Sequence, residues 1–295
     1  MGLLSTTRYI FGHPLNRGGR VAALGRFFRW QIASRLLPYP VALPFVNDSR
    51  LFVERGMTGA TGNYYCGLHE ADDMAFVLHF LRDGDAFYDV GANVGSYTIL
   101  ATAAGVKNIT SFEPSPATCV RLENNIRLNR VSQHVEVNQC ALGNENGEVR
   151  FTKGHDTVNH VAAANDNSDA TELVQIRRFD DFYKKGPASF IKIDVEGYEA
   201  FVLSGADAAL DDPDLMGILI EDNGSDQRYE SKQPVGEILK SHGFSPYRYD
   251  AINRELKADS ATMGLFGNIL FLRNVEEAIK RVKTAGKFRL INGWI

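Results

Sequence analysis

The chain has 295 residues, of which 44% are hydrophobic and 23% are charged, so it can bury a full core and stay dissolved in water. Its net charge of −4 gives no overall attraction to nucleic acid, and it has no Asn-Pro-Pro-Tyr motif of the kind found in base-flipping enzymes. It also has no apolar run of the roughly 18–20 residues that cross a bilayer and no signal-peptide core, so we expect a cytoplasmic protein.

The first 46 residues are predicted to form a basic extension. Six arginines occur there before the first acidic residue, Asp48. Apolar residues recur at helical spacing over 21–37, and prolines follow, which predicts an amphipathic helix. Its apolar stripe consists of Val21, Leu24, Phe28, Ile32 and Leu36. Packing of this helix on the rest of the protein is the first interpretation, and peripheral contact with the inner face of a membrane is the alternative.

Residues 47–275 are expected to form the main domain, followed by a C-terminal helix and tail at 276–295. The domain begins with a glycine-rich and aromatic stretch, in which 50–53 is predicted to be a strand and the glycines indicate turns. Tyr64 in this stretch is a candidate substrate contact. A helix predicted over 71–82 leads into the first core strand.

A strand, a tight turn and a helix start follow one another in the first core motif. The strand ends in Asp89, Gly91 and Gly95 bracket the turn, Ser96 follows it, and residues 98–104 are predicted to be helical, which is the arrangement of a nucleotide-binding βα unit. Asn93 stands where a dinucleotide fingerprint has its middle glycine. The carboxylate of Asp89 would repel a phosphate but suits an amino group, while the N–H groups at the helix start can bind a polar ligand.

The second core strand is predicted over 108–112 and is followed by Glu113 and Pro114. A carboxylate in this place can accept both hydroxyls of a ribose. Together with Asp89, it favours S-adenosylmethionine over a nicotinamide cofactor. The alternative is that the two glycines serve only a sharp turn and that Asp89 caps it.

The third predicted strand, 135–140, ends at Ala141 and Leu142. A hairpin strand is predicted at 148–152, and a polar loop at 154–171 follows it. A long loop in a compact domain is often a lid or a binding loop.

The strand predicted at 190–193 carries ionisable residues in an apolar setting. Lys192, Asp194 and Glu196 share one side if the chain stays extended, and charges in a core strand are costly unless they are paired or used. Asp194 lies at the carboxyl end of the strand, where α/β sheets bind ligands, so we assign it to the active site. Lys192 either takes part in the chemistry or only neutralises a neighbouring acid.

The strand predicted at 216–220 ends in a polar cluster that contains Glu221 and Asn223. Both are candidate substrate contacts. A helix at 235–242 and a last core strand at 268–272 complete the predicted domain.

Four motifs together resemble the FkbM family of S-adenosylmethionine-dependent methyltransferases. They are Asp-Val-Gly-Ala-Asn-Val-Gly-Ser-Tyr-Thr from Asp89, Phe-Glu-Pro from Phe112, Ala-Leu-Gly from Ala141 and Ile-Lys-Ile-Asp-Val-Glu-Gly-Tyr-Glu from Ile191. The similarity spans roughly Gly56 to Arg273. It implies an α/β, Rossmann-like class I methyltransferase fold with a mostly parallel seven-stranded sheet and helices on both faces, to which the N-terminal helix and strand are added.

The resemblance also implies roles for particular residues. The segment before the first core strand folds over the cofactor pocket in this family, which makes Glu70 a candidate cofactor contact. Ala141 and Leu142 would line the adenine ring. The family commonly has an Asn-His pair in the long loop, so Asn159 and His160 are candidates on the substrate side.

Two mechanisms are consistent with these residues. In the first, Asp194 or His160 accepts the proton of an alcohol directly. In the second, Asp194 and Glu221 hold Mg²⁺ through hard oxygen ligands. Glu196 and Lys192 are further catalytic candidates in either case.

The expected function is O-methylation of a sugar hydroxyl in a glycan or glycolipid, with S-adenosylmethionine as cofactor. Methylation of a polyketide or another secondary metabolite is the alternative enzyme activity. A non-catalytic cofactor-binding scaffold in glycan assembly is the alternative from another class. We expect no nucleic-acid partner, and a homodimer is one option for assembly.

Overall fold

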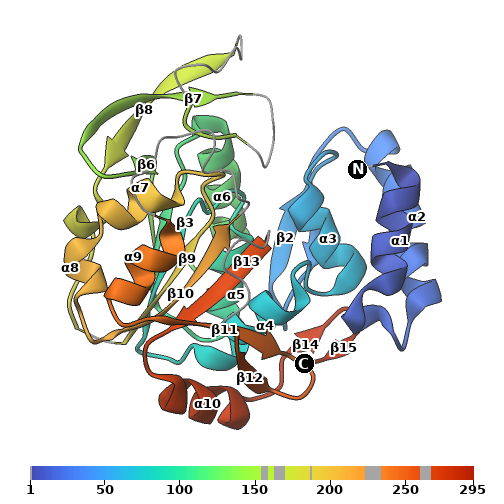
Figure 1. The fold of residues 1–295 in the computed structure, drawn as a ribbon. Helices are drawn as coiled ribbons and strands as arrows, with labels where there is room; N and C mark the ends of the chain where they lie inside the picture. Colours follow the sequence, from blue (N-terminus) through green and yellow to red (C-terminus); the bar gives the residue numbers. More distant parts are fainter. Residues whose placement is uncertain (1, 154–158, 163–169, 187, 223–233, 260–266) are drawn as a thin grey trace.

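The computed structural model describes residues 2–153, 159–162, 170–186, 188–222, 234–259 and 267–295. One eight-stranded sheet forms the centre of the described chain (Figure 1), in the order β12-β11-β13-β10-β9-β3-β4-β5. Its strands span Ala86–Val90 (β3), Asn108–Phe112 (β4), Val135–Asn138 (β5), Ser189–Ile193 (β9), Leu215–Asp222 (β10), Ser245–Asp250 (β11), Glu255–Ala258 (β12) and Gly267–Leu272 (β13).

The order of the strands creates a place for a ligand. Strands β5, β4, β3, β9 and β10 are parallel neighbours, whereas β13 runs antiparallel to β10 and β11. The chain first adds β4 and β5 on one side of β3 and then crosses over to add β9 and β10 on the other side. At such a switch point the carboxyl ends of the strands leave a crevice, which is where open α/β sheets bind ligands.

Strands β3 and β9 are buried along their whole length because other elements cover both faces of the sheet. Phe87 and Phe190 point into one hydrophobic layer, and their neighbours Tyr88 and Ile191 point into the other. The first layer contains α4 (Ala71–Phe80), α5 (Ser96–Ala103) and α6 (Pro116–Leu128), and the second contains α7 (Glu199–Ser204), α8 (Asp207–Leu210) and α9 (Val235–Ser241).

The predicted mostly parallel α/β sheet with helices on both faces is confirmed, with eight strands instead of seven. The additional strand is β12, which pairs only with β11 at the edge of the sheet. Its four residues, Glu-Leu-Lys-Ala, alternate in polarity, but the run is short and has no β-branched or aromatic residue, so the sequence pattern did not predict a strand there.

A small sheet lies beyond the carboxyl ends of the central strands (Figure 1). It has the order β6-β8-β7, with β6 at Ala141–Leu142, β7 at Gly147–Thr152 and β8 at Thr171–Arg177. Strands β7 and β8 pair antiparallel, as expected for the predicted hairpin, and β6 pairs with β8 in parallel.

The N-terminal part forms a separate group of elements beside the central sheet (Figure 1). It contains α1 (Leu3–Gly12), a 3-10 turn η1 (Pro14–Asn16), α2 (Arg20–Leu36), the paired strands β1 (Val41–Pro44) and β2 (Arg50–Val53), and α3 (Thr58–Cys66). The sequence-based prediction of turns over α3 was wrong. Gly62 lies inside this helix. A Cβ atom there would come within 2.2 Å of His69 Nδ1, so the glycine allows α3 to pack closely against His69.

Helix α2 packs on α3 through a face that the sequence pattern did not identify. Phe27 and Trp30 are buried, and the Phe27 ring contacts the Tyr65 ring edge-on, with the centroids 5.3 Å apart. Arg26 lies on this side too and donates from Nε to the Tyr64 carbonyl at 2.9 Å. Most of the predicted apolar stripe is instead exposed: Val21, Phe28, Ile32 and Leu36. No helix in the described ranges has both the length and the apolar character needed to cross a bilayer.

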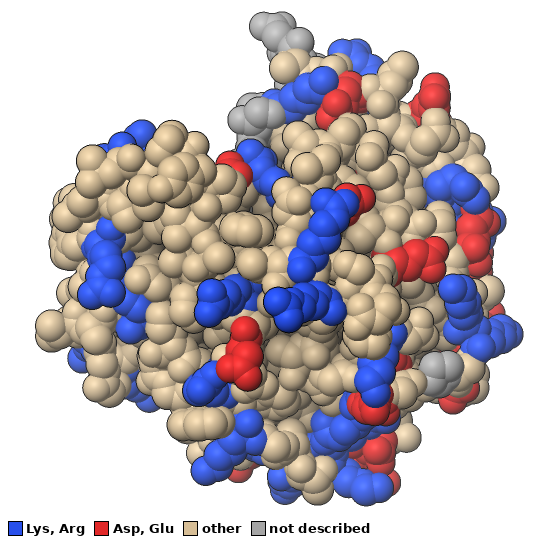
Figure 2. Space-filling model, turned by 180° about the vertical axis from the view of Figure 1, so that it is seen from behind, with Lys and Arg blue, Asp and Glu red and all other residues tan. Residues whose placement is uncertain are grey.

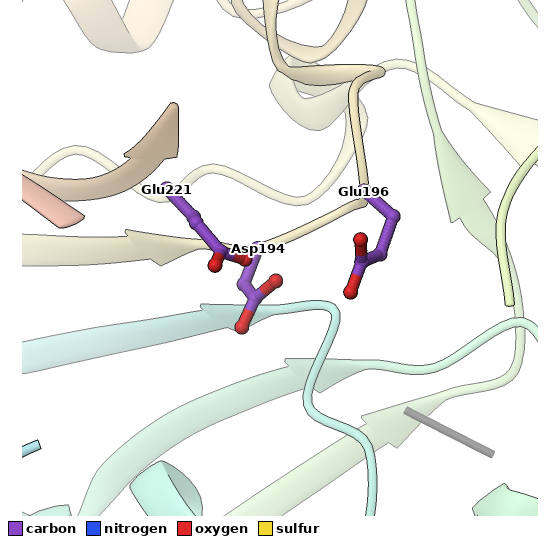
Figure 3. Close-up of side chains that lie close together, drawn as sticks. All are labelled: Asp194, Glu196 and Glu221. Carbon is purple, nitrogen blue, oxygen red and sulfur yellow. The ribbon is translucent and has the colours of Figure 1, made fainter. Parts of the chain in front are cut away.

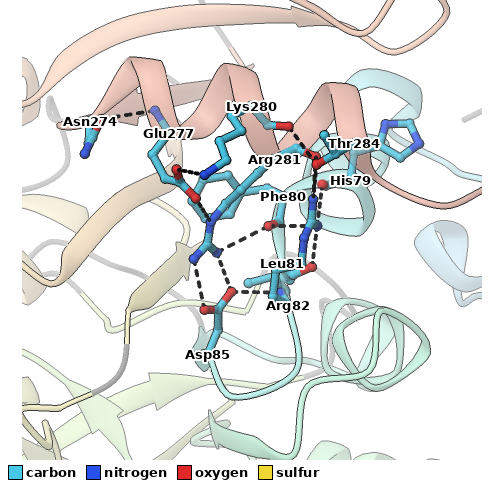
Figure 4. Close-up of polar contacts among 10 residues, drawn as sticks. All are labelled: His79, Phe80, Leu81, Arg82, Asp85, Asn274, Glu277, Lys280, Arg281 and Thr284. Carbon is cyan, nitrogen blue, oxygen red and sulfur yellow. Dashed lines mark hydrogen bonds and ion pairs between the residues drawn. The ribbon is translucent and has the colours of Figure 1, made fainter.

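A buried ion pair joins the C-terminal helix α10 (Val275–Thr284) to the turn between α4 and β3 (Figure 4). Arg281 lies 2.6 Å from Asp85, and both side chains are largely shielded from solvent. Asp85 also accepts from the backbone N–H of Arg82 at 2.8 Å. The last residues form the paired strands β14 (Arg289–Leu290) and β15 (Gly293–Trp294), and Asn292 between them donates to the Leu15 and Cys66 carbonyls.

Candidate active site

A pocket lies at the switch point, over the carboxyl ends of β3, β4, β9 and β10. The segment between β2 and α4, including the start of α3, forms one wall, and β6 with the residues around it forms another. The lining residues from these parts that matter below are Asn63, Glu70, Asp89, Gly91, Asn93, Ser96, Tyr97, Glu113, Pro114, Ala141, Leu142, Asn159, Lys192, Asp194, Glu196 and Glu221.

The turn after β3 is held open by two glycines. Gly91 has a φ of 78°, and a side chain there would come within 1.8 Å of the Asp194 carbonyl oxygen. Gly95 has a φ of 90°, and a side chain there would meet Leu122 at 2.5 Å. Gly91 therefore lets the turns after β3 and β9 approach each other, and Gly95 fits the turn against α6 without itself lining the pocket.

Glu113 lies directly after β4 and anchors the same turn. Its Oε2 accepts from the backbone N–H of Asn93 at 3.0 Å, and its Oε1 accepts from the backbone N–H of Ser115 at 2.9 Å. Burial raises the pKa of Glu113 to about 7, despite these two hydrogen bonds. Each carboxylate oxygen keeps a second lone pair, so Glu113 can still accept from a ligand.

Asp89 forms the opposite side of the first turn. Its Oδ2 accepts from the Thr98 hydroxyl at 2.5 Å, and that hydroxyl also lies 2.8 Å from the Ser111 hydroxyl. Burial raises the pKa of Asp89 to about 6. The carboxylate is thus fixed by its neighbours and would gain from a cationic ligand beside it.

Lys192 and Asp194 form a charged pair at the end of β9. The Lys192 ammonium is only 1% exposed, and it lies 3.5 Å from Asp194 Oδ2 and 3.2 Å from Asn268 Oδ1. Burial opposes its charge, but Asp194, Glu70 and Glu221 more than compensate, so the pKa of Lys192 is raised. Burial would likewise raise the pKa of Asp194, but Lys192 lowers it below its ordinary value. Both groups are therefore ionised at neutral pH.

Three carboxylates face one another beside this pair (Figure 3). Oxygen atoms of Asp194, Glu196 and Glu221 all lie within 4.8 Å of one another. Glu196 has a φ of 56°, and the turn that carries it is fixed by Glu199, whose Oε1 accepts from the Gly197 N–H at 3.0 Å. Burial raises the pKa of Glu199 to about 7. The cluster can accept hydrogen bonds from a polar ligand.

Two pocket residues, in α5 and α3, were not identified by sequence reasoning. The Tyr97 hydroxyl donates to Glu70 Oε2 at 2.5 Å, and the Tyr97 ring lies 5.4 Å from the Lys192 ammonium. Asn63 Oδ1 accepts from the His69 N–H at 2.7 Å, which ties α3 to the segment before α4. Tyr97 stands inside the first motif, so that motif could have indicated it. Asn63 gave no signal, because α3 was not predicted.

The structure places three of the predicted site residues outside the pocket lining. Tyr64 is buried between α2 and α3, where its carbonyl accepts from Arg26. In the described part of the loop, Asn159 and Val161 line the pocket, whereas His160 between them does not. The backbone N–H of His160 donates to the Thr152 hydroxyl at 2.9 Å. Gly95 is the third, for the reason given above. Asn223 lies outside the described residues.

The fold is a Rossmann-like α/β sheet with a pocket at its switch point. A sequence model of the Methyltransferase FkbM domain matches residues 89–246, more than half of the chain, and the chain belongs to this family.

Relatives with known names support the same family. The chain is 28% identical to 31-O-demethyl-FK506 methyltransferase FkbM of Streptomyces tacrolimicus over 200 residues, which are 56% of this chain and 74% of that protein. It is 29% identical to Methyltransferase 1 of Beauveria bassiana over 149 residues (42% and 59%) and 26% identical to hexuronic acid methyltransferase AglP of Haloferax volcanii over 144 residues (48% and 58%). The matches thus span less than two thirds of the last two proteins.

Solved structures also resemble the chain. The crystal structure of Methyltransferase FkbM from Methylobacillus flagellatus is similar with a TM-score of 0.45 and 20% identity. That similarity covers 72% of this chain and 52% of the other.

Proposed function

We propose that the chain is an S-adenosylmethionine-dependent O-methyltransferase whose acceptor is a sugar hydroxyl of a glycan or glycolipid. The observation that carries this proposal is the convergence of three carboxylates, those of Asp89, Glu113 and Asp194, on one pocket at the switch point of the sheet.

The pocket fits the cofactor in three respects. Glu113 keeps acceptor capacity for two ribose hydroxyls, and Asp89 offers a fixed carboxylate to a cationic amino group. Ala141 and Leu142 give an apolar wall for an adenine ring. When bound, S-adenosylmethionine supplies a methyl group on a positively charged sulfur.

The residues at the end of β9 would assist transfer of this methyl group. With the cofactor bound, the acceptor oxygen would form a bond to the methyl carbon as the carbon–sulfur bond breaks, and the electron pair of that bond would remain on sulfur. Asp194 is ionised and takes the proton of the hydroxyl, and Lys192 holds it in place. Glu196 and Glu221 can accept hydrogen bonds from the other hydroxyls of a sugar.

We assign no metal ion to the three carboxylates. The ammonium of Lys192 already lies 3.5 Å from Asp194 and supplies positive charge where Mg²⁺ would supply it. The acceptor side is thus a cluster of hydrogen-bond acceptors, formed by Asp194, Glu196 and Glu221, with Asn159 nearby. Such a surface suits a polyol better than a largely apolar polyketide, and the hexuronic acid methyltransferase among the relatives agrees with this choice.

Two measurements test the proposal in sequence. Calorimetry should detect binding of S-adenosylhomocysteine to the wild-type chain and binding at least about tenfold weaker to Glu113→Ala, because a hydrogen bond to a charged group contributes about 1.5–3 kcal/mol. Equal affinities would disprove the cofactor site.

Mass spectrometry of acceptors incubated with S-adenosylmethionine then distinguishes the activities. Transfer to uronic-acid-containing oligosaccharides supports the sugar acceptor, and transfer to a polyketide alcohol alone would favour the alternative activity. Binding without transfer to either class of acceptor would instead favour the non-catalytic scaffold.

A further inference from the structure

We propose that the outer surface of the α1–α2 pair is a docking face for an anionic membrane surface. We define the docking face by its exposed apolar residues and the arginines around them: Leu3, Leu4, Phe11, Val21, Phe28, Ile32 and Leu36, with Arg8, Arg17, Arg20, Arg29 and Arg35.

Part of the docking face is shared between the two helices. Leu3 of α1 lines a shallow groove together with Phe28, Ile32 and Leu36 of α2. At the other end of the pair, the Arg20 guanidinium lies 4.6 Å from the centre of the Phe11 ring. The two helices thus run side by side, as Figure 1 shows at the outer edge of the molecule. Exposed apolar surface shared by neighbouring helices is uncommon on a monomer and indicates an interaction site.

Helix α2 has two apolar sides, one packed on the rest of the protein and one exposed to solvent. Ala23, Phe27 and Trp30 are buried against the rest of the protein. The positions 21, 28, 32 and 36 recur at helical spacing on the opposite side and remain in solvent. A helix needs only one apolar side to pack on a domain, so the second side calls for another partner.

The positive charge of the docking face favours an anionic partner. Residues 2–47 contain six arginines and no acidic residue, whereas the whole chain has a net charge of −4. Five of these arginines are exposed, and Arg26 alone turns inward. Figure 2 shows the lobe of α1 and α2 with basic and uncharged side chains and no acidic ones on the visible face.

Helices that lie in an anionic lipid surface typically carry arginines beside exposed apolar side chains. There the apolar groups enter the acyl boundary, and the guanidinium groups stay among the head groups. A second copy of the same face would bring two sets of like charges together, which disfavours a dimer through it.

The docking face is directly connected to the pocket wall. The Tyr9 hydroxyl of α1 donates to the His69 carbonyl at 2.6 Å, and His69 lines the pocket beside Glu70. In a docked chain, a helix at the lipid surface therefore also contacts the pocket wall. That arrangement suits an acceptor carried on a lipid, a consequence that rests on the proposed function, whereas docking itself does not.

Sedimentation with vesicles tests the docking face without any need for turnover. The full chain should sediment with vesicles of phosphatidylcholine that contain phosphatidylglycerol, sediment less as salt is raised, and stay in solution with pure phosphatidylcholine. The double variant Phe28→Ser/Ile32→Ser should lower the partition onto the anionic vesicles by about tenfold or more.

Ile252→Ser is the matched control, since Ile252 lies between β11 and β12 outside the docking face and is 63% exposed, as is Ile32. It should sediment like the wild type, and all variants should keep the wild-type unfolding temperature. Wild-type protein that ignores anionic vesicles, or a double variant that sediments like the wild type, would overturn the proposal. The proposal would also be overturned if the wild-type chain formed a dimer and did not bind vesicles, and the double variant abolished that dimer.

Discussion

Asp194 is the residue on which the proposed chemistry depends most. Its backbone N–H donates to the Val90 carbonyl at 3.0 Å, so Asp194→Asn should leave the turn intact. We expect methyl transfer to fall by ~10²-fold or more, the usual scale for a lost proton acceptor, while S-adenosylhomocysteine binds as before. Steady-state kinetics and calorimetry check this pair of results. Asp207→Asn, on the exposed surface of α8, is the control.

Two outcomes would contradict this assignment. Near-normal turnover of Asp194→Asn would show that the carboxylate is structural. Wild-type activity that a chelator removes and Mg²⁺ restores would show that Asp194 and Glu221 bind a metal after all.

Glu113 should make the stability of the free protein depend on pH. Its pKa is raised from an ordinary value near 4.5 to about 7, so the folded state binds a proton more tightly than the unfolded state. The stability that this proton contributes is fully present below about pH 4.5 and is lost as pH rises through about 7. Glu113→Gln removes this effect, so the wild type should lose stability relative to the variant between these pH values, by at most about 3 kcal/mol.

Urea unfolding of both proteins at several pH values measures this difference. The comparison must be made between wild type and variant, because other groups also titrate. The raised pKa values of Asp89 and Glu199 act in the same direction as Glu113, whereas His13, His69 and His79 have lowered pKa values and act in the opposite direction. A difference that stays constant across the range would mean that Glu113 is not held in a desolvated environment.

At the scale of single elements, α2 shows how differently two sides of one helix contribute. Trp30 is 5% exposed, whereas Ile32 is 63% exposed. Trp30→Ala should lower the free energy of unfolding by roughly 3–5 kcal/mol because it leaves a cavity in the core. Ile32→Ala should change it by about 0.5 kcal/mol or less. Equal effects in denaturant unfolding would mean that α2 does not pack in the way described.

Helix α10 depends on one buried ion pair. Arg281→Met leaves Asp85 buried without its charged partner and should cost about 3–5 kcal/mol. The double variant Arg281→Met/Asp85→Asn should recover a large part of that loss, because no uncompensated charge remains. Arg127→Met breaks an exposed pair with Glu123 and should cost about 1 kcal/mol or less. Thermal unfolding compares the three, and a double variant no better than the single one would refute the explanation.

At the scale of the whole molecule, the sequence predicted those helices, strands and turns that are determined by residues close together in the chain. Helix α6 begins at Pro116, a residue type common at the first helical position, with Ser115 as its N-cap, and β4 has the predicted bounds. The two turns that hold Asp89 and Glu113 followed from glycine and carboxylate positions. These features depend on residues that are close together in the chain.

The sequence did not predict features that depend on distant partners. Helix α3 contains glycines that a local pattern assigns to turns, and only the approach of His69 explains Gly62. Apolar residues lie on both sides of α2, so periodicity could not decide which side packs against Tyr65. Tyr64 was predicted to be a substrate contact in the glycine-rich and aromatic stretch, but it is buried beside α2.

Ligand binding should stabilise the segments that form the pocket walls against local opening. The walls come from 57–70, the turns after β3 and β4, and 140–142, whereas α10 lies away from them. We expect S-adenosylhomocysteine to slow amide hydrogen exchange in these four segments, because opening any of them must first release the ligand. Exchange in α10 should change little, and Glu113→Gln at the same ligand concentration should show less protection. Slower exchange in α10 alone, or no change around the pocket, would show that the ligand binds elsewhere.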